Sequence, residues 1–185
     1  VNNFTQSEKK VSKSILNILS QIKGRVIIAT FASNVYRVQQ IVEASIKCNR
    51  KIIVFGRSME KTINVGQQLK YIKAPAGTFI SVKDLPMYPP NRITILSTGT
   101  QGEPLAALSR IALGTHKHIK VIPNDTIIFS SSAIPGNQEG INKTINLLYH
   151  AGANVIINSP LTDTHTSGHA SSSELQLMLC LARPK

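Results

Sequence analysis

Five short apolar runs rich in Val and Ile recur along the chain, and segments with helical periodicity lie between them. Continuous β-branched runs of this kind are typical of strands that are buried on both faces of a sheet. Alternation of such strands with helices calls for a parallel sheet with right-handed crossovers. The sequence therefore predicts an α/β fold, a doubly wound and mostly parallel sheet with helices on both faces. The expected strands are residues 25–30, 51–55, 92–96, 126–129 and 154–158.

The helices between these strands carry recognisable signals at their ends. Ser33 or Asn34 is suited to cap a helix over residues 35–48. Val and Ile form the inward face of this helix, and we expect Arg37 and Gln40 to lie away from that face. The other expected helices are residues 8–22, 59–71, 104–113, 138–150 and a last one from about residue 172.

The remaining segments are less regular. Residues 74–92 contain four prolines and are interpreted as a connection with one short strand near 78–82. Pro104 suits the first turn of its helix, because that turn leaves its N–H groups unpaired anyway. Cys48 and Cys180 are too few for a disulfide framework, so both are interpreted as buried, reduced thiols in an intracellular protein. Surface or connection positions are assigned to His116, His118 and His150.

Each predicted strand ends in a loop rich in Ser, Thr, Gly and Asn. The carboxyl ends of parallel strands lie on one edge of a sheet, where α/β proteins bind ligands, so the five loops would form one polar floor. Unpaired N–H groups and hydroxyls at such strand tips suit phosphate, and Arg57 adds a forked donor. The phosphate-binding residues expected at the first four tips are Ser33, Asn34, Arg57, Thr98, Gly99, Ser131 and Ser132.

The last tip leads into residues 163–169 (DTHTSGH), which set two imidazoles, His165 and His169, beside Ser167 and Gly168. Taken alone, the loop is equally consistent with a polar turn and two incidental histidines. Four earlier loops of the same design favour a phosphate site. The i, i+4 histidine spacing would suit zinc on a helix, but the Thr-Ser-Gly between them disfavours a helix, so no metal site is expected in this chain.

Several catalytic and cofactor-binding motifs are missing from the sequence. There is no H-x-H-x-D-H cluster, no C-x-x-C pair, and no glycine-rich P-loop or dinucleotide fingerprint. No G-x-S-x-G element marks a serine nucleophile. The sequence therefore predicts a phosphate-binding surface without hydrolytic machinery of its own.

The charge indicates the kind of partner. The net charge is +12, and residues 1–73 hold 13 Lys and Arg against three Glu. Such an excess favours a polyanion, either nucleic acid or an anionic membrane. No basic helix carries Trp or Phe along an apolar side, and no apolar run approaches ~20 residues. We therefore expect a nucleic acid as partner and no membrane.

Several stretches of the chain resemble the beta-CASP domain of ribonuclease J, within the metallo-β-lactamase superfamily of nucleases. The resemblance runs in order along nearly the whole chain, with Ala133 and Ala170 standing where the family pattern has Pro and Gly. The stretches that carry it are residues 29–34 (ATFASN), 55–59 (FGRSM), 97–104 (STGTQGEP), 129–137 (FSSSAIPGN) and 165–169 (HTSGH).

The resemblance implies a function for the chain. In that family the beta-CASP domain is inserted in a metallo-β-lactamase domain, and RNA passes between the two. A zinc pair in the lactamase domain drives 5′-to-3′ exonuclease and endonuclease cleavage of RNA, preferably 5′-monophosphorylated. The zinc ligands lie outside this chain, so zinc is expected only in the full-length enzyme. The family's Ser-Gly-His element contacts RNA phosphate, which implies Ser167, Gly168 and His169 here, with His169 as the catalytic residue.

We therefore expect one beta-CASP-like domain over residues 1–185, excised from a longer nuclease and inactive alone. Its helix over 172–185 would lead back to the missing metallo-β-lactamase domain, and a homo-oligomer is a further partner that the sequence allows. The alternatives are a non-catalytic RNA- or nucleotide-phosphate-binding module and a sugar-phosphate isomerase-type domain. The expected location is the cytoplasm, or the plastid stroma for a plastid gene, because Lys-, Asn- and Ile-rich usage indicates an AT-rich genome.

Overall fold

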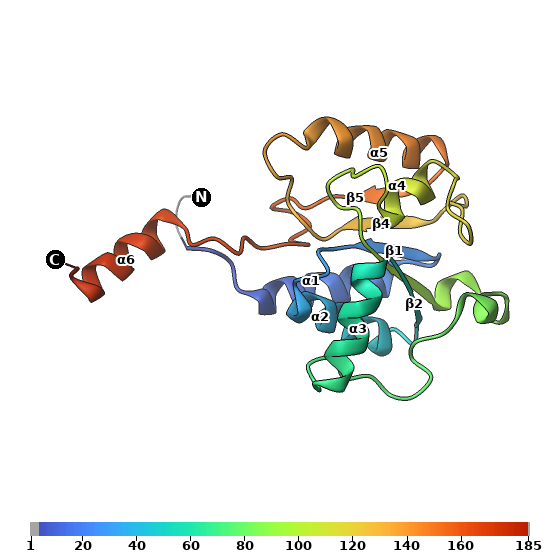
Figure 1. The fold of residues 1–185 in the computed structure, drawn as a ribbon, viewed down its shortest axis with the longest axis horizontal. Coiled ribbons are helices and arrows are strands. Elements are labelled where there is room, and N and C mark those ends of the chain that lie inside the picture. The colour runs from blue at the N-terminus through green and yellow to red at the C-terminus, as the bar shows by residue number, and fades with distance from the viewer. Residues whose placement is uncertain (1–3, 185) are drawn as a thin grey trace.

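The computed structural model describes residues 4–184 and contains a five-stranded sheet in the order β2-β3-β1-β4-β5, with every pair parallel (Figure 1). The predicted α/β fold is confirmed. The strands are β1 (Val26–Ala29), β2 (Lys51–Phe55), β3 (Ile93–Ser97), β4 (Thr126–Phe129) and β5 (Asn154–Ile156). The helices are α1 (Glu8–Gln21), α2 (Val35–Lys47), α3 (Arg57–Gln68), α4 (Ala107–Ala112), α5 (Gln138–His150) and α6 (Ser172–Ala182), with 3-10 turns η1 (Val82–Met87) and η2 (Pro90–Arg92).

Two apolar layers cover the sheet, one on each face. Helices α1, α2 and α3 lie on one side and α4 and α5 on the other (Figure 1). Successive side chains of a strand point to opposite faces, so Ile28 packs with the first group and Ile27 with the second. Both are fully buried, and burial of such a side chain contributes about 1.5–3 kcal/mol. Because both faces need apolar residues, the strands read as unbroken apolar runs.

Residues 78–82 do not form the predicted strand. They make a single parallel bridge, Ile52 with Phe79, in which the Ile52 N–H donates to Thr78 O and the Ile80 N–H to Ile52 O. The segment then turns at once into η1, where Ser81 and Asp84 form a capping box. The reciprocal cap stabilises the turn directly after the bridge, so the pairing ends after one step.

The helix after β3 begins later than predicted. It starts at Ala107, with Ala106 at the N-cap, and Pro104 lies in the preceding turns. Two glycines with positive φ, Gly99 (109°) and Gly102 (72°), bend residues 98–106 before a helix can form. Asn34 does cap α2 as predicted, because its side chain accepts a hydrogen bond from the Arg37 N–H at 2.9 Å.

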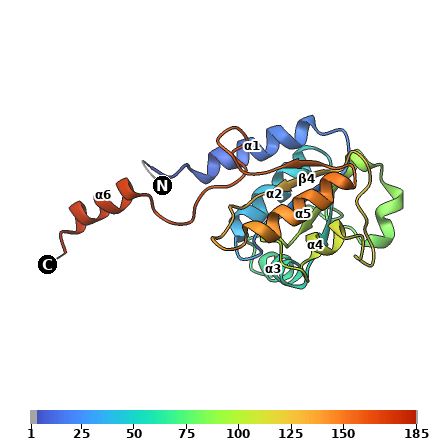
Figure 2. The same ribbon diagram turned by 90° about the horizontal axis from the view of Figure 1, so that it is seen from above.

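Helix α6 extends away from the rest of the chain in both views (Figures 1 and 2). Its Ser171 cap and Glu174 form a capping box. Its apolar side chains are exposed, including those of Leu175, Met178 and Leu181. Cys180 is exposed as well, so its predicted burial is wrong. No helix within residues 4–184 has the length and hydrophobicity needed to cross a membrane.

Two other residues also differ from expectation. Cys48 is only half-buried, and burial raises the pKa of its thiol, against the smaller opposing effect of Arg50. His116 lies in the connection between α4 and β4, as predicted, but it is buried there, because its ring packs edge-on against Phe55 with 4.7 Å between centroids. Its Nδ1 accepts the Ile119 N–H, and burial lowers its pKa. His116 is therefore a neutral core residue at pH 7.

Candidate nucleic-acid interface

The carboxyl ends of all five strands lie on one edge of the sheet, as predicted. In the register, Ala29 pairs with both Ser97 and Phe129, and Phe55 pairs with Ser97, so the strands end nearly level. The strand order decides which tips are neighbours. The tips of β1, β4 and β5 lie together on one half of the edge, and those of β3 and β2 lie on the other.

A cleft of about 770 Å³ opens over the β1, β4 and β5 half of this edge. Three loops and the start of α1 form its walls. It is hereafter called the tip cleft. Its lining residues are Glu8, Phe31, Ser33, Asn34, Ser132, Ala133, Ile134, Pro135, His165, Thr166, Ser167, Gly168 and His169.

The structure brings six of the predicted phosphate-binding residues together and leaves four outside. Those that line the tip cleft are Ser33, Asn34, Ser132, Ser167, Gly168 and His169. Ser131 is buried and lines a smaller neighbouring pocket of about 220 Å³ that shares Ser132. Arg57, Thr98 and Gly99 follow β2 and β3 and do not line the tip cleft. Arg57 is exposed in the first turn of α3, whereas Gly99 is buried.

The Ser-Gly-His loop closes on itself through one hydroxyl. Ser167 Oγ accepts the His169 N–H at 3.0 Å and donates to His169 O at 3.1 Å. Ser167 therefore shapes the turn, and its hydroxyl must give up the bond to His169 O before it can donate to a ligand. The side chains of this turn face the tip cleft, and His169 lies at its exposed rim. The imidazole is thus placed as the accessible donor of the loop.

His165 lies deeper than His169. Its N–H donates to Asn158 Oδ1 at 2.9 Å, which ties the loop to the end of β5. Burial lowers the pKa of the His165 ring, and Arg37 lowers it further, against a smaller opposing effect of Glu8. His165 is therefore neutral at pH 7 and lines the tip cleft without adding charge.

Arg37 is fully buried beneath the tip cleft and was not among the site residues predicted from the sequence. Its Nη1 donates to Ser130 Oγ and to Thr164 O, both at 2.8 Å. Its Nη2 and Nε bind the Glu8 carboxylate at 2.8–3.1 Å. Position 37 lies four residues before Ile41 and so falls on the inward stripe of α2. That spacing indicates an inward position, but a charged side chain is normally assigned to the surface, so burial of Arg37 was not predicted. Gln40 is also buried, and its burial was not predicted for the same reason: its side chain is polar.

Gln101 is a second residue that sequence reasoning missed. It is buried, and both the nitrogen and the oxygen of its side-chain amide bind the loop after β4. Its Nε2 donates to Ser132 O at 3.0 Å, and its Oε1 accepts the Ile134 N–H at 2.8 Å. A tip-cleft wall is therefore fixed by a residue from the loop after β3.

The surface carries fewer positive charges than the 21 Lys and Arg of the sequence would provide if all were exposed. Arg25, Arg37 and Arg50 are all buried, and two of them pair with carboxylates, Arg25 with Asp125 and Arg37 with Glu8. The cationic side chains left for a polyanion are chiefly lysines. Within the described part of the chain, no group of three or more His, Cys, Asp or Glu could hold a metal ion.

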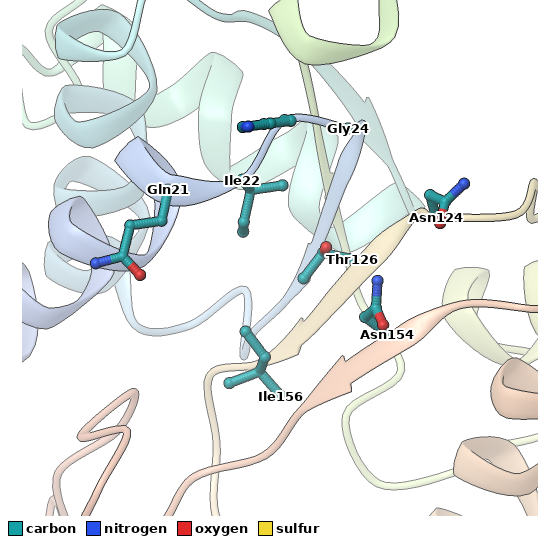
Figure 3. A pocket seen from close by; sticks show the side chains of 8 residues that line it. Gln21, Ile22, Gly24, Asn124, Thr126, Asn154 and Ile156 are labelled. Carbon is teal, nitrogen blue, oxygen red and sulfur yellow. The ribbon is translucent and has the colours of Figure 1, made fainter.

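A separate cleft of about 580 Å³ lies towards the other end of the strands (Figure 3). It is lined by the end of α1 and by the starts of β1, β4 and β5, including Gln21, Ile22, Asn124 and Asn154. Lys23 is its one lining residue with a charge. It lacks the clustered hydroxyl, imidazole and backbone donors of the tip cleft, so it is a less suitable site for phosphate.

The fold and the tip cleft define a doubly wound α/β domain that offers a polar ligand edge at the carboxyl ends of its strands. The sequence model of the family "Ribonuclease J, beta-CASP domain" matches residues 23–148, and the chain belongs to this family. The resemblance noted from the motifs is thereby confirmed. The matched range ends before the Ser-Gly-His loop.

Similar proteins extend the match over nearly the whole chain. Ribonuclease J 1 of Streptococcus pyogenes is 53% identical over 182 residues, which are 98% of this chain and 32% of that protein. Ribonuclease J of Corynebacterium glutamicum is 45% identical over 97% of the chain and 25% of its own length. Ribonuclease J2 of Bacillus subtilis is 42% identical over 98% of the chain and 32% of its own length. The chain thus spans a quarter to a third of these relatives.

Proposed function

We propose that this chain is the RNA-binding domain of a longer ribonuclease J-like, zinc-dependent nuclease of the cytoplasm or plastid stroma. In this proposal the tip cleft holds RNA phosphates against the metal site of a metallo-β-lactamase domain of the same polypeptide. The observation that carries the proposal is the convergence of six hydroxyl, amide, backbone and imidazole groups from three strand tips on one cleft. The names of the relatives support RNA as the substrate.

The electrostatics of the tip cleft support a phosphate ligand. Glu8 is paired with Arg37, and Asp163 beside the loop is paired with Lys10 at 2.9 Å. Both carboxylates are thus neutralised, so they repel an incoming phosphate less. Hydroxyl and imidazole donors that are held in place strengthen as charge develops on the phosphate oxygens. His169 is assigned as the catalytic donor because it lies at the accessible rim, where a phosphate can meet a partner domain.

The zinc ions of the proposed enzyme belong outside this chain. The described residues do not supply the three or so protein ligands that catalytic zinc needs. When bound in the partner domain, zinc would supply the activated nucleophile and the Lewis acid for hydrolysis. The residues of this chain would bind and orient the RNA, with 5′-monophosphorylated ends preferred, and the isolated chain would be inactive. The exposed apolar helix α6 is proposed to lead back to the lactamase domain.

The test is steady-state cleavage of a 5′-monophosphorylated oligoribonucleotide by the full-length enzyme and three histidine variants. His169→Ala should lower kcat by ~10²–10³-fold, the usual effect of losing one preorganised donor. His165→Ala should have a mild effect, because that ring is neutral and set back from the rim. His150→Ala is the matched control at the exposed C-terminal end of α5 and should leave kcat unchanged.

RNA affinity separates catalysis from binding in the same experiment. His169→Ala should change the affinity only modestly, because the remaining phosphate contacts are spread over many groups. Ser167→Ala should give a smaller catalytic defect than His169→Ala, since the backbone donors of the turn survive. If His169→Ala folds, binds RNA and turns over like the unmodified enzyme, the catalytic assignment is wrong. If the enzyme binds RNA without cleaving it, the chain belongs to a non-catalytic binding module.

A further inference from the structure

The segment that leads into the Ser-Gly-His loop is anchored at Thr164. The side chain of Thr164 donates to Phe129 O at 3.1 Å, and its carbonyl accepts from Ser130 Oγ at 2.6 Å and from Arg37 Nη1 at 2.8 Å. Thr164 is fully buried. Its carbonyl is thus held from two sides, one residue before His165.

The start of the chain runs beside this segment and makes contacts with it. Thr166 Oγ1 donates to Gln6 O at 2.8 Å, and Lys10 pairs with Asp163. Thr5 donates through both its N–H and its hydroxyl to the carboxylate of Glu174. Among these contacts of residues 4–184, the pair of Glu8 with Arg37 extends deepest, because the Arg37 side chain is fully buried.

Arg37 joins these parts through one rigid group. A guanidinium is planar and always charged, and it presents five N–H donors in a fixed fork. One side of the Arg37 fork binds the Glu8 carboxylate of α1, and the other binds Ser130 after β4 and Thr164 before the loop. Desolvating such a pair offsets most of its attraction, so a buried pair is weak support for stability as such. What the arrangement does determine is the relative position of α1, the β4 tip and the loop.

We infer that Arg37 is a positioning residue for the tip cleft: from beneath, it fixes the Thr164 carbonyl and thereby the place of Ser167 and His169. This inference rests on the proposed function, in which those two residues meet an RNA phosphate. Arg37 itself touches no ligand, because it is fully buried. Its loss leaves every tip-cleft side chain present but no longer held in one geometry.

The experiment uses the full-length enzyme with Arg37→Met and Ser130→Ala. Ser130→Ala removes the hydroxyl that donates to the Thr164 carbonyl, and it tests the same inference if Arg37→Met does not fold. Arg50→Met is the matched control, because Arg50 is equally buried but donates to Gly24 O, Ile22 O and Ile93 O near the start of β1 and β3. Each variant is assayed for kcat and KM on a 5′-monophosphorylated oligoribonucleotide and for amide hydrogen exchange.

Arg37→Met should lower kcat on the order of 10²-fold, the effect of misplacing a catalytic group by about 1 Å. KM should change little, and hydrogen exchange should accelerate in residues 163–171. Ser130→Ala should change kcat and exchange in the same direction and by less. Arg50→Met should lower the thermal unfolding temperature while kcat and exchange in 163–171 stay unchanged. Wild-type kcat and exchange in the folded Arg37→Met and Ser130→Ala variants would overturn the inference.

Failure of the proposed function gives a different pattern. In that case the unmodified enzyme does not cleave RNA, yet hydrogen exchange of residues 163–171 still reports whether Arg37 holds the loop. Faster exchange with unchanged turnover in Arg37→Met would show that Arg37 holds the loop, but it would refute the inference that this placement serves catalysis and would leave the nuclease assignment standing. Equal kcat losses in Arg37→Met and Arg50→Met would also refute it, because the effect would then be one of general stability.

Discussion

Replacement of Gly102 by Ala tests how the loop after β3 is packed beneath a wall of the tip cleft. Gly102 has φ of 72°, and a Cβ added there would overlap the carbonyl of Gly140 and lie 2.6 Å from the Ile141 N atom. Both neighbours are backbone in the first turn of α5, so neither can rotate away. The neighbouring Gln101 side chain holds Ser132 and Ile134, so a shift of this loop would also move the cleft wall.

The loss of folding stability expected for Gly102→Ala is the sum of a backbone effect and a packing effect. A left-handed backbone costs a non-glycine residue roughly 1–2 kcal/mol. Forcing a methyl group against fixed atoms typically adds 1–3 kcal/mol, so Gly102→Ala should destabilise the fold by about 2–5 kcal/mol. Gly114 supplies the matched control, because its φ is 71° and a Cβ there would meet nothing within 4 Å. Gly114→Ala should therefore show the backbone effect alone, about 1–2 kcal/mol.

Thermal and urea unfolding of the two variants separate the effects. At this chain length 1 kcal/mol corresponds to about 2–4 °C in Tm, so Gly102→Ala should melt roughly 2–12 °C below Gly114→Ala. Equal Tm values for the two variants would refute the packing of residue 102 against α5. A larger loss for Gly114→Ala would contradict the whole placement of the β3 loop.

Two further predictions concern pH and the cleft wall. Burial lowers the pKa of His116 and His165 below 6.5 in the folded state, so the unfolded chain takes up protons first as the pH falls. In urea unfolding, the unfolding free energy should be highest above pH 6.5 and should fall below that pH, by a smaller amount in His165→Asn. An unfolding free energy that is independent of pH between 5 and 7.5 would contradict this. Gln101→Leu should accelerate hydrogen exchange of residues 132–137 and weaken RNA binding, because it leaves Ser132 O and the Ile134 N–H without their partner. Unchanged exchange in residues 132–137 would show that this wall of the tip cleft does not depend on Gln101.

Much of the fold could be predicted because local patterns determine it. Unbroken runs of Val and Ile predict strands that are buried on both faces, and all five strands were predicted from them. Helix α5 was predicted at residues 138–150 from its periodicity and the glycine that follows it. Errors arose where a local rule was overridden. Pro104 fits a first helical turn in general, but the glycines at 99 and 102 delay the helix to Ala107.

The tip cleft was predictable only in part, because its composition depends on strand order. All five loops were expected on one edge, and the parallel sheet confirms it. Which loops are neighbours is decided by tertiary packing, so the separation of Arg57 and Thr98 from Ser167 had no local signal. Arg37 was missed for another reason: polarity assigned it to the surface, whereas Glu8, 29 residues earlier, neutralises it in the interior.

NMR mapping of RNA binding on the ¹⁵N-labelled chain shows directly whether RNA binds in the tip cleft. A short 5′-monophosphorylated oligoribonucleotide should shift the amide signals of residues 33–34, 132–134 and 165–169, which line the tip cleft. Amides of Arg57 and Gly99, on the other half of the same edge, should shift much less. Shifts of residues 21–24, 124 and 154 around the opposite cleft instead, or no shift of any of these signals, would contradict RNA binding in the tip cleft.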